Sequence, residues 1–94
     1  MSDPTANPPA EPLNVYAVLA VMLDQLSSIA WQKMGLQPDP FTGTMDRDLT
    51  QSRVAIDVAE SMVKALDGQL DEEDRRQMHN LMRDLKVNYV EHSK

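Results

Sequence analysis

The strongest constraint in this sequence is an uninterrupted run of nine apolar residues, from Val15 to Leu23. The run opens a helical segment in which Asp24 is the only charged residue before Lys33. A helix that is apolar over most of its circumference must be buried on more than one side. The rest of the chain is too short to surround such a helix. We therefore expect a helical bundle that is completed by a second copy or by a partner.

The 94 residues are enough for one small domain. Four prolines fall within the first 12 residues, and proline lacks an N–H donor and fixes φ, so residues 1–13 are predicted to form a disordered or extended tail. Residues 14–94 are predicted to form a single three-helix domain. The chain has no cysteine, which excludes disulfides and thiolate metal sites. Domains of this size often rely on oligomerisation for stability.

The first helix is predicted over residues 14–34, with Asn14 as its N-cap and Gly35 just past its end. Its apolar residues cover roughly 220° of the helix circumference. The second helix is predicted over residues 47–67, with Asp46 or Asp48 at its start, and its apolar arc is roughly 200° wide. Both arcs are wider than one neighbouring helix can cover.

The third helix is predicted over residues 71–91, with Asp71 as N-cap and acidic residues in its first turn. Its apolar stripe is only about 100° wide, as expected for a helix that covers the other two. The fold class is therefore all-α, a helical hairpin plus a covering helix, completed by homodimerisation. The residues predicted to mediate self-association are Val15, Leu19, Met22, Leu23, Leu26, Trp31, Val58 and Met62.

The connection between the first two helices contains a specified turn. Pro38 and Pro40 forbid helix, Asp39 favours the start of a turn, and Gly43 supplies a position with positive φ.

The net charge of −6 and the pI of about 4.6 disfavour attraction to nucleic acid or to an anionic membrane. The first 12 residues lack the basic and apolar regions of a signal peptide. The apolar run would be about 13 Å long as a helix, far short of a bilayer core. These features predict a cytoplasmic protein that does not enter the membrane.

No catalytic, cofactor or metal site is predicted. His79 could serve as a ligand or base, but Arg75 and Arg83 flank it one turn away on either side and would repel a metal ion. Acidic residues near the turn lack the spacing of a calcium-binding loop. The three glycines lie at helix boundaries or turns, so no phosphate-binding loop is indicated.

Basic residues on the third helix form the one surface feature that suggests binding. A basic stripe beside an apolar one can contact phosphates or an acidic partner. The alternative, which we favour, is that the stripe pairs with Asp57 or Glu60 of the second helix, or that Arg76 pairs with Glu72 one turn away. The stripe consists of Arg75, Arg76, His79, Arg83 and Lys86.

Several motifs stand out along the three predicted helices and their connections: Met34-Gly35, Pro38 to Gly43, Gly68 to Glu73, Leu81, Leu85 and Tyr89-Val90. Together these motifs resemble a small bacterial family known as domain of unknown function 1844. The resemblance covers about residues 15–90 and implies a bacterial, cytoplasmic, all-helical protein without implying an activity. Lys86 and Gln69 depart from the residues expected at those positions.

The sequence thus favours a non-enzymatic helical interaction module that self-associates through its first two helices. It leaves open an unidentified protein partner. The alternative function is a nucleic-acid or ribosome-associated accessory factor that uses the basic stripe.

Overall fold

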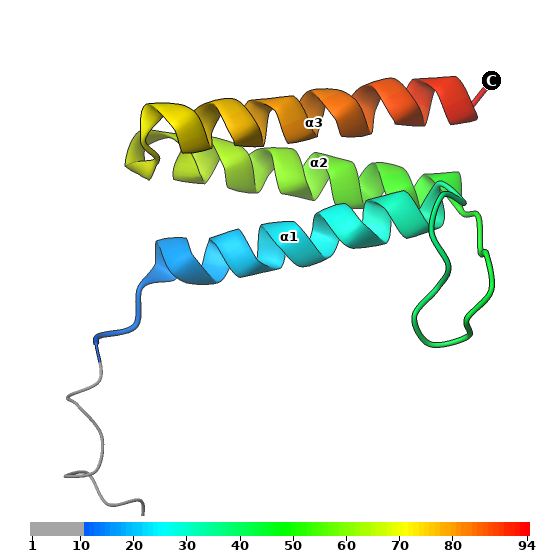
Figure 1. Ribbon diagram of the computed structural model, residues 1–94, viewed down its shortest axis with the longest axis horizontal. Coiled ribbons are helices and arrows are strands. Elements are labelled where there is room, and N and C mark those ends of the chain that lie inside the picture. The colour runs from blue at the N-terminus through cyan, green and yellow to red at the C-terminus, as the bar shows by residue number, and fades with distance from the viewer. Residues whose placement is uncertain (1–10) are drawn as a thin grey trace, which may run out of the picture.

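The computed structural model describes residues 11–94, and over this range the protein is all-helical. It contains three α-helices, α1 (Val15–Lys33), α2 (Leu49–Leu66) and α3 (Glu72–His92), and a short 3-10 helix, η1 (Asp67–Gln69), between α2 and α3. Figure 1 shows α2 running between α1 and α3. The all-α, three-helix prediction is confirmed. Most of the predicted N-terminal tail lies outside the described residues.

Side-chain caps set the start of each helix. Asn14 and Asp71 cap α1 and α3, as predicted, by accepting hydrogen bonds from backbone N–H groups of the first turn. Asp48 caps α2 in the same way, so that helix begins two residues later than the predicted start at Arg47. Its end also differs, because Asp67 continues the chain into η1 instead of extending α2.

The contact between α1 and α2 is built from small side chains. Ala30 of α1 and Ser52 and Ala59 of α2 are all 0% exposed. The Ser52 hydroxyl donates a hydrogen bond of 2.9 Å to the Ala30 carbonyl oxygen on the other helix. Small residues let two helix backbones approach closely, and the hydrogen bond satisfies a polar group that would be costly to bury alone. The two helices therefore form a tight antiparallel hairpin.

The third helix packs mainly on α2. Met82 and Leu85 of α3 are buried, and Met78, Leu81 and Tyr89 are half-buried beside them. This is the apolar stripe expected for a covering helix. Contacts between α1 and α3 are sparse compared with those that each makes to α2. Consequently α2 is the central helix, and α3 covers only one side of the hairpin.

The loop between α1 and α2 is a rigid turn. Asp39 accepts hydrogen bonds through Oδ1 from the backbone N–H groups of Phe41 and Thr42, and its own N–H donates to the Thr44 carbonyl at 2.8 Å. Gly43 has φ 73°, as predicted for the turn, and its N–H donates to the Asp39 carbonyl at 2.8 Å. These bonds fix the shape of the loop locally, as in an Asx turn.

Both ends of the loop are attached to the helices. The ammonium group of Lys33 lies 2.6 Å from Asp46 Oδ2, and the Asp48 N–H donates to the Lys33 carbonyl at 2.8 Å. The hydrogen bond to Asp46 raises the pKa of Lys33. At the other end, the Arg47 guanidinium donates to the His92 carbonyl of α3. The loop is therefore held in place relative to the hairpin.

We predict that the α1–α2 contact tolerates no larger side chain at Ser52. Ser52→Ala removes one interhelical hydrogen bond and should lower the free energy of unfolding by about 0.5–1.5 kcal/mol. Ser52→Leu should cost about 1–3 kcal/mol or more because it separates the helices. Urea denaturation at a fixed protein concentration measures both values.

Ser61→Ala is the matched control, because Ser61 is exposed on the same helix and bonds only to the Asp57 carbonyl one turn back. Its effect should stay within about 0.5 kcal/mol. A Ser52→Leu variant as stable as this control would contradict the close packing of the two helices.

Candidate functional site

The most prominent surface feature is a row of exposed apolar residues along α1. Val15, Val18, Met22 and Ile29 are all exposed, and with Gln25 and Gln32 they repeat at alternating spacings of three and four residues. This is the spacing at which one helix packs along another in a coiled coil. We call these six positions the α1 seam. None of them is charged.

Exposed apolar residues of α2 continue this surface. Val54 and Val58 are exposed on α2. Leu19 and Leu26 of α1 and Met62 of α2 are half-buried and pack against the core. We call the combined surface the hairpin face; besides Gln25 and Gln32 of the seam, its apolar members are Val15, Val18, Leu19, Met22, Leu26, Ile29, Val54, Val58 and Met62.

The hairpin face lies on the side of the hairpin away from α3. Ala20, which points roughly opposite to the α1 seam, lines a hollow with Met78 of α3. Glu60, which lies roughly opposite to Val58 on α2, pairs with Lys86 of α3. The third helix therefore leaves this face uncovered, and no other described segment crosses it.

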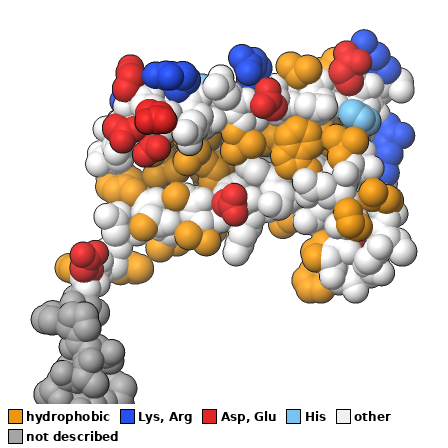
Figure 2. Space-filling view, viewed as in Figure 1, with side chains coloured by type: hydrophobic (Ala, Val, Ile, Leu, Met, Phe, Trp, Pro, Cys, Tyr) orange, Lys and Arg blue, Asp and Glu red, His pale blue; other side chains and the backbone are white. Residues whose placement is uncertain are grey.

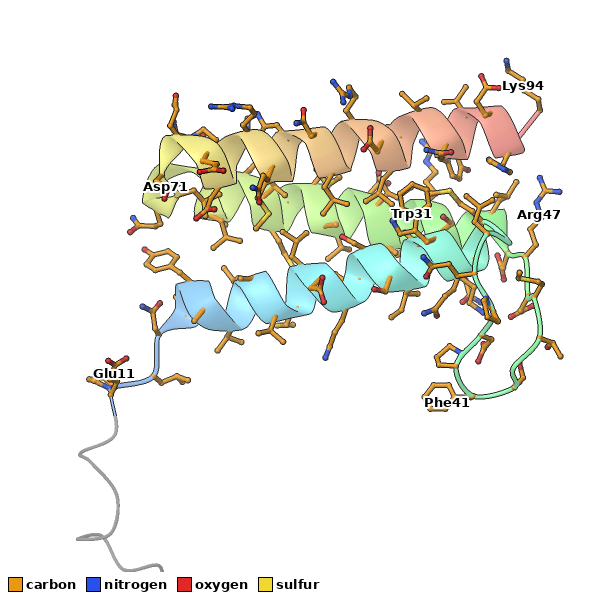
Figure 3. All side chains as sticks on the ribbon, in the orientation of Figure 1. Glu11, Trp31, Phe41, Arg47, Asp71 and Lys94 are labelled. Carbon is orange, nitrogen blue, oxygen red and sulfur yellow. The ribbon has the colours of Figure 1, made fainter. Side chains whose placement is uncertain are left out.

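Most of the residues predicted to mediate self-association lie on this face, and two do not. Leu23 is only 1% exposed because it fills the core between the helices of a single chain. Trp31 is half-buried on the same side of α1 as Ala20, and Figure 3 shows it pointing toward α2 and α3. Leu23 is therefore not available to contact a second copy, so its assignment to the interface is wrong. Trp31 lies off the hairpin face, and its role in self-association stays a prediction.

A second apolar surface lies between α1 and α3. Figure 2 shows it as a band of hydrophobic side chains across the molecule. Ala20, Leu70, Met78 and Leu81 line a shallow hollow of about 460 Å³ there. These four residues are all half-buried, whereas most side chains of the hairpin face are exposed. The fold itself thus shields this band better than it shields the hairpin face.

The start of the basic stripe is engaged in bonds within the chain. Arg75 Nε lies 3.6 Å from Asp67 Oδ2, and its guanidinium also donates to the carbonyls of Asp67 and Leu70. His79 Nε2 lies 2.8 Å from Asp67 Oδ1. These side chains fasten α3 to the end of α2. Glu72, which was predicted to pair with Arg76, instead lies 3.4 Å from Arg75.

The remainder of the stripe is partly paired. Lys86 bonds to Glu60, as predicted, and this hydrogen bond lowers the pKa of Glu60. Asp57 does not reach α3; it lies 3.9 Å from Arg53 of its own helix. Arg83 lies 3.5 Å from its neighbour Asp84. Within the described residues Arg76 alone of the stripe forms no ion pair.

The aspartates of the loop are occupied by structural roles. Asp39 accepts the bonds of the turn, Asp46 pairs with Lys33, and Asp48 caps α2. Within residues 11–94 no three His, Asp or Glu side chains are grouped so that they could hold a metal ion. No helix in this range is long and apolar enough to span a bilayer.

The Lys86–Glu60 pair predicts a pH-dependent contribution to stability. Because the folded-state pKa of Glu60 is depressed, the carboxylate stabilises the fold above about pH 4 and loses that effect as the pH falls further. Glu60→Gln should therefore lower the free energy of unfolding at pH 7 by at most about 1 kcal/mol. The difference from the wild type should shrink below about pH 4.

Asp57→Asn is the control for this experiment, because Asp57 pairs only loosely with the exposed Arg53. Urea denaturation across the pH range should show little change for this variant. A Glu60→Gln effect that persists undiminished at pH 3 would contradict an electrostatic origin.

Comparison with known proteins adds a family and no activity. No curated protein and no solved structure is detectably similar to the chain. A family model covers residues 17–91, which include all of α2 and nearly all of α1 and α3. The match agrees with the resemblance carried by the turn and the helix boundaries. The chain belongs to the family described as Domain of unknown function (DUF1844).

Proposed function

We propose that this protein is a non-enzymatic helical interaction module in which two copies associate through the hairpin face. The observation that carries the proposal is the uncharged row of apolar residues along α1, continued by Val54 and Val58 of α2. Contiguous apolar surface of this kind on a small protein marks an interaction site. Two hairpins that pack face to face would form a four-helix core.

The physical gain comes from covering side chains that one chain cannot cover. Val15 is 58% exposed and Val58 is 41% exposed, although both lie on helices whose other sides are in the core. Burial of apolar area stabilises an association by about 25 cal/mol per Å² before the entropic costs of binding. A stable interface typically buries roughly 800 Å² from each partner.

The pairing of the basic stripe favours this proposal over nucleic-acid binding. Arg75, His79 and Lys86 are engaged with Asp67 or Glu60 of the same chain. A phosphate would have to displace these carboxylates, and the net charge of −6 would oppose its approach. The hairpin face carries no such competing interaction.

Light scattering across a concentration series tests the proposal. The wild type should have the mass of a dimer at high concentration. Met22→Glu and Val58→Glu should each weaken the dimer at least tenfold, because a buried unpaired carboxylate is costly to desolvate. Both positions are exposed in a single chain, so the fold should survive and can be checked by circular dichroism.

Val87→Glu is the matched control, because Val87 is an exposed valine on α3, away from the hairpin face. It should leave the dimer unchanged. A wild type that remains monomeric at high micromolar concentration would refute self-association, as would dissociation by Val87→Glu equal to that by Met22→Glu.

A further inference from the structure

We infer that the loop between α1 and α2 is an arm with which each copy holds the other, Phe41 of one chain packing on Val18 and Val21 of the partner's α1. The inference rests on the proposed self-association and adds its geometry: an antiparallel, two-fold pairing of the α1 helices. The occupant of the surface beneath the arm is therefore a second copy of this chain.

The arm presents a large apolar side chain to solvent in a fixed position. Phe41 is 97% exposed, the highest value among the exposed large hydrophobic residues. Figure 3 shows it at the far end of the loop, on the side of α1 away from α2 and α3. The bonds to Asp39 and the ion pair between Lys33 and Asp46 hold the loop in this shape. Within residues 11–94, a phenylalanine held out in this way is left almost wholly in solvent.

The space under the arm is open, and its lining is mixed: apolar and amide side chains lie beside the charged groups of Asp24, Lys33 and Asp39. Pro40 and Phe41 form one wall of a hollow of about 610 Å³. The opposite wall is the outer side of α1, including Gln25, Ile29 and Gln32 of the seam. The hollow thus faces the surface that a second α1 would contact if two seams met.

A two-fold axis near Gln25 would bring the arm of one chain onto the exposed valines of the other chain. The arm projects beside the C-terminal half of α1, and exposed valines lie in its N-terminal half, Val21 being 59% exposed. In an antiparallel pair each arm would reach the N-terminal half of the other α1. Both contacts form at once, as in an isologous interface. In a parallel pair both arms would lie at the same end of the dimer, and neither would reach the N-terminal half of the other α1.

The charge distribution also favours a second copy as the occupant. Two chains of net charge −6 repel each other. The outer side of α1 is where they can approach at the lowest cost, because Asp24 is the only charged residue between Asn14 and Lys33. A basic partner would instead be attracted to the acidic start of α3, where Asp71 to Asp74 are all exposed. The neutral seam therefore suits a copy of itself.

Truncation of Phe41 tests the arm. Phe41→Ser should raise the dissociation constant of the dimer at least tenfold, because it removes a large buried apolar area from both halves of the interface. Met45→Ser is the matched control, since Met45 is exposed on the same loop but outside the hollow. It should change the dissociation constant less than threefold. Sedimentation equilibrium measures both, and circular dichroism checks that the helices are retained.

Disulfide trapping tests the pairing itself, and the chain suits it because it has no cysteine. A Phe41→Cys chain mixed with a Val21→Cys chain should form a covalent heterodimer on mild oxidation. Phe41→Cys mixed with Val87→Cys should not, because Val87 lies on α3. Phe41→Cys alone should trap poorly, because the two arms lie at opposite ends of an antiparallel pair.

The outcomes separate this inference from the function on which it rests. If Met22→Glu dissociates the dimer but Phe41→Ser does not, the hairpin face mediates association and the arm is refuted. Efficient trapping of Phe41→Cys with itself would overturn the antiparallel pairing. A monomeric wild type would overturn both proposals.

Discussion

The close approach of α1 and α2 at Ala30, Ser52 and Ala59 is the contact on which the rest of the structure depends. Because these side chains are small, the two backbones pack tightly and the Ser52 hydroxyl reaches the Ala30 carbonyl. Tight packing of two helices buries a narrow strip of each. The wide apolar arcs of both helices therefore extend beyond the contact, and a single third helix covers the excess on only one side. The hairpin face is the part that remains.

Charged and apolar surfaces are separated in the same molecule. The ion pairs of Asp67 and Glu60 fasten α3 to α2 and occupy much of the basic stripe. The opposite side of the hairpin carries aliphatic and amide side chains along the α1 seam. Ion pairs at a solvated surface contribute little free energy but fix geometry, whereas apolar burial contributes more and is less selective. The proposed dimer forms through the apolar surface, and the rigid loop between α1 and α2 would make that association selective for a second copy in one orientation.

Sequence periodicity predicted which helices form and how wide their apolar sides are. It did not predict which part of each apolar side is buried in the core of a single chain. Leu23 and Met22 are neighbours in one apolar run, yet Leu23 is in the core and Met22 is exposed. Neighbouring side chains on a helix point in directions that differ by 100°, so the direction from which α2 packs on α1 determines which of the two is buried. The pattern likewise did not place Trp31 on the side of α1 that faces α3, because the position of α3 was not available from it.

The sequence by itself determined the three helices, the caps of α1 and α3 and the turn around Asp39, because these depend on interactions between residues close in the chain; for α2 it left Asp46 and Asp48 as alternatives. It also determined that more apolar surface exists than three helices can bury. Only the tertiary structure decided where the surplus lies, since exposure depends on the directions from which α2 and α3 approach α1. It likewise decided that Arg75, His79 and Lys86 of the basic stripe pair with Asp67 or Glu60, and that Phe41 stands apart from the helices, because both depend on how the segments pack.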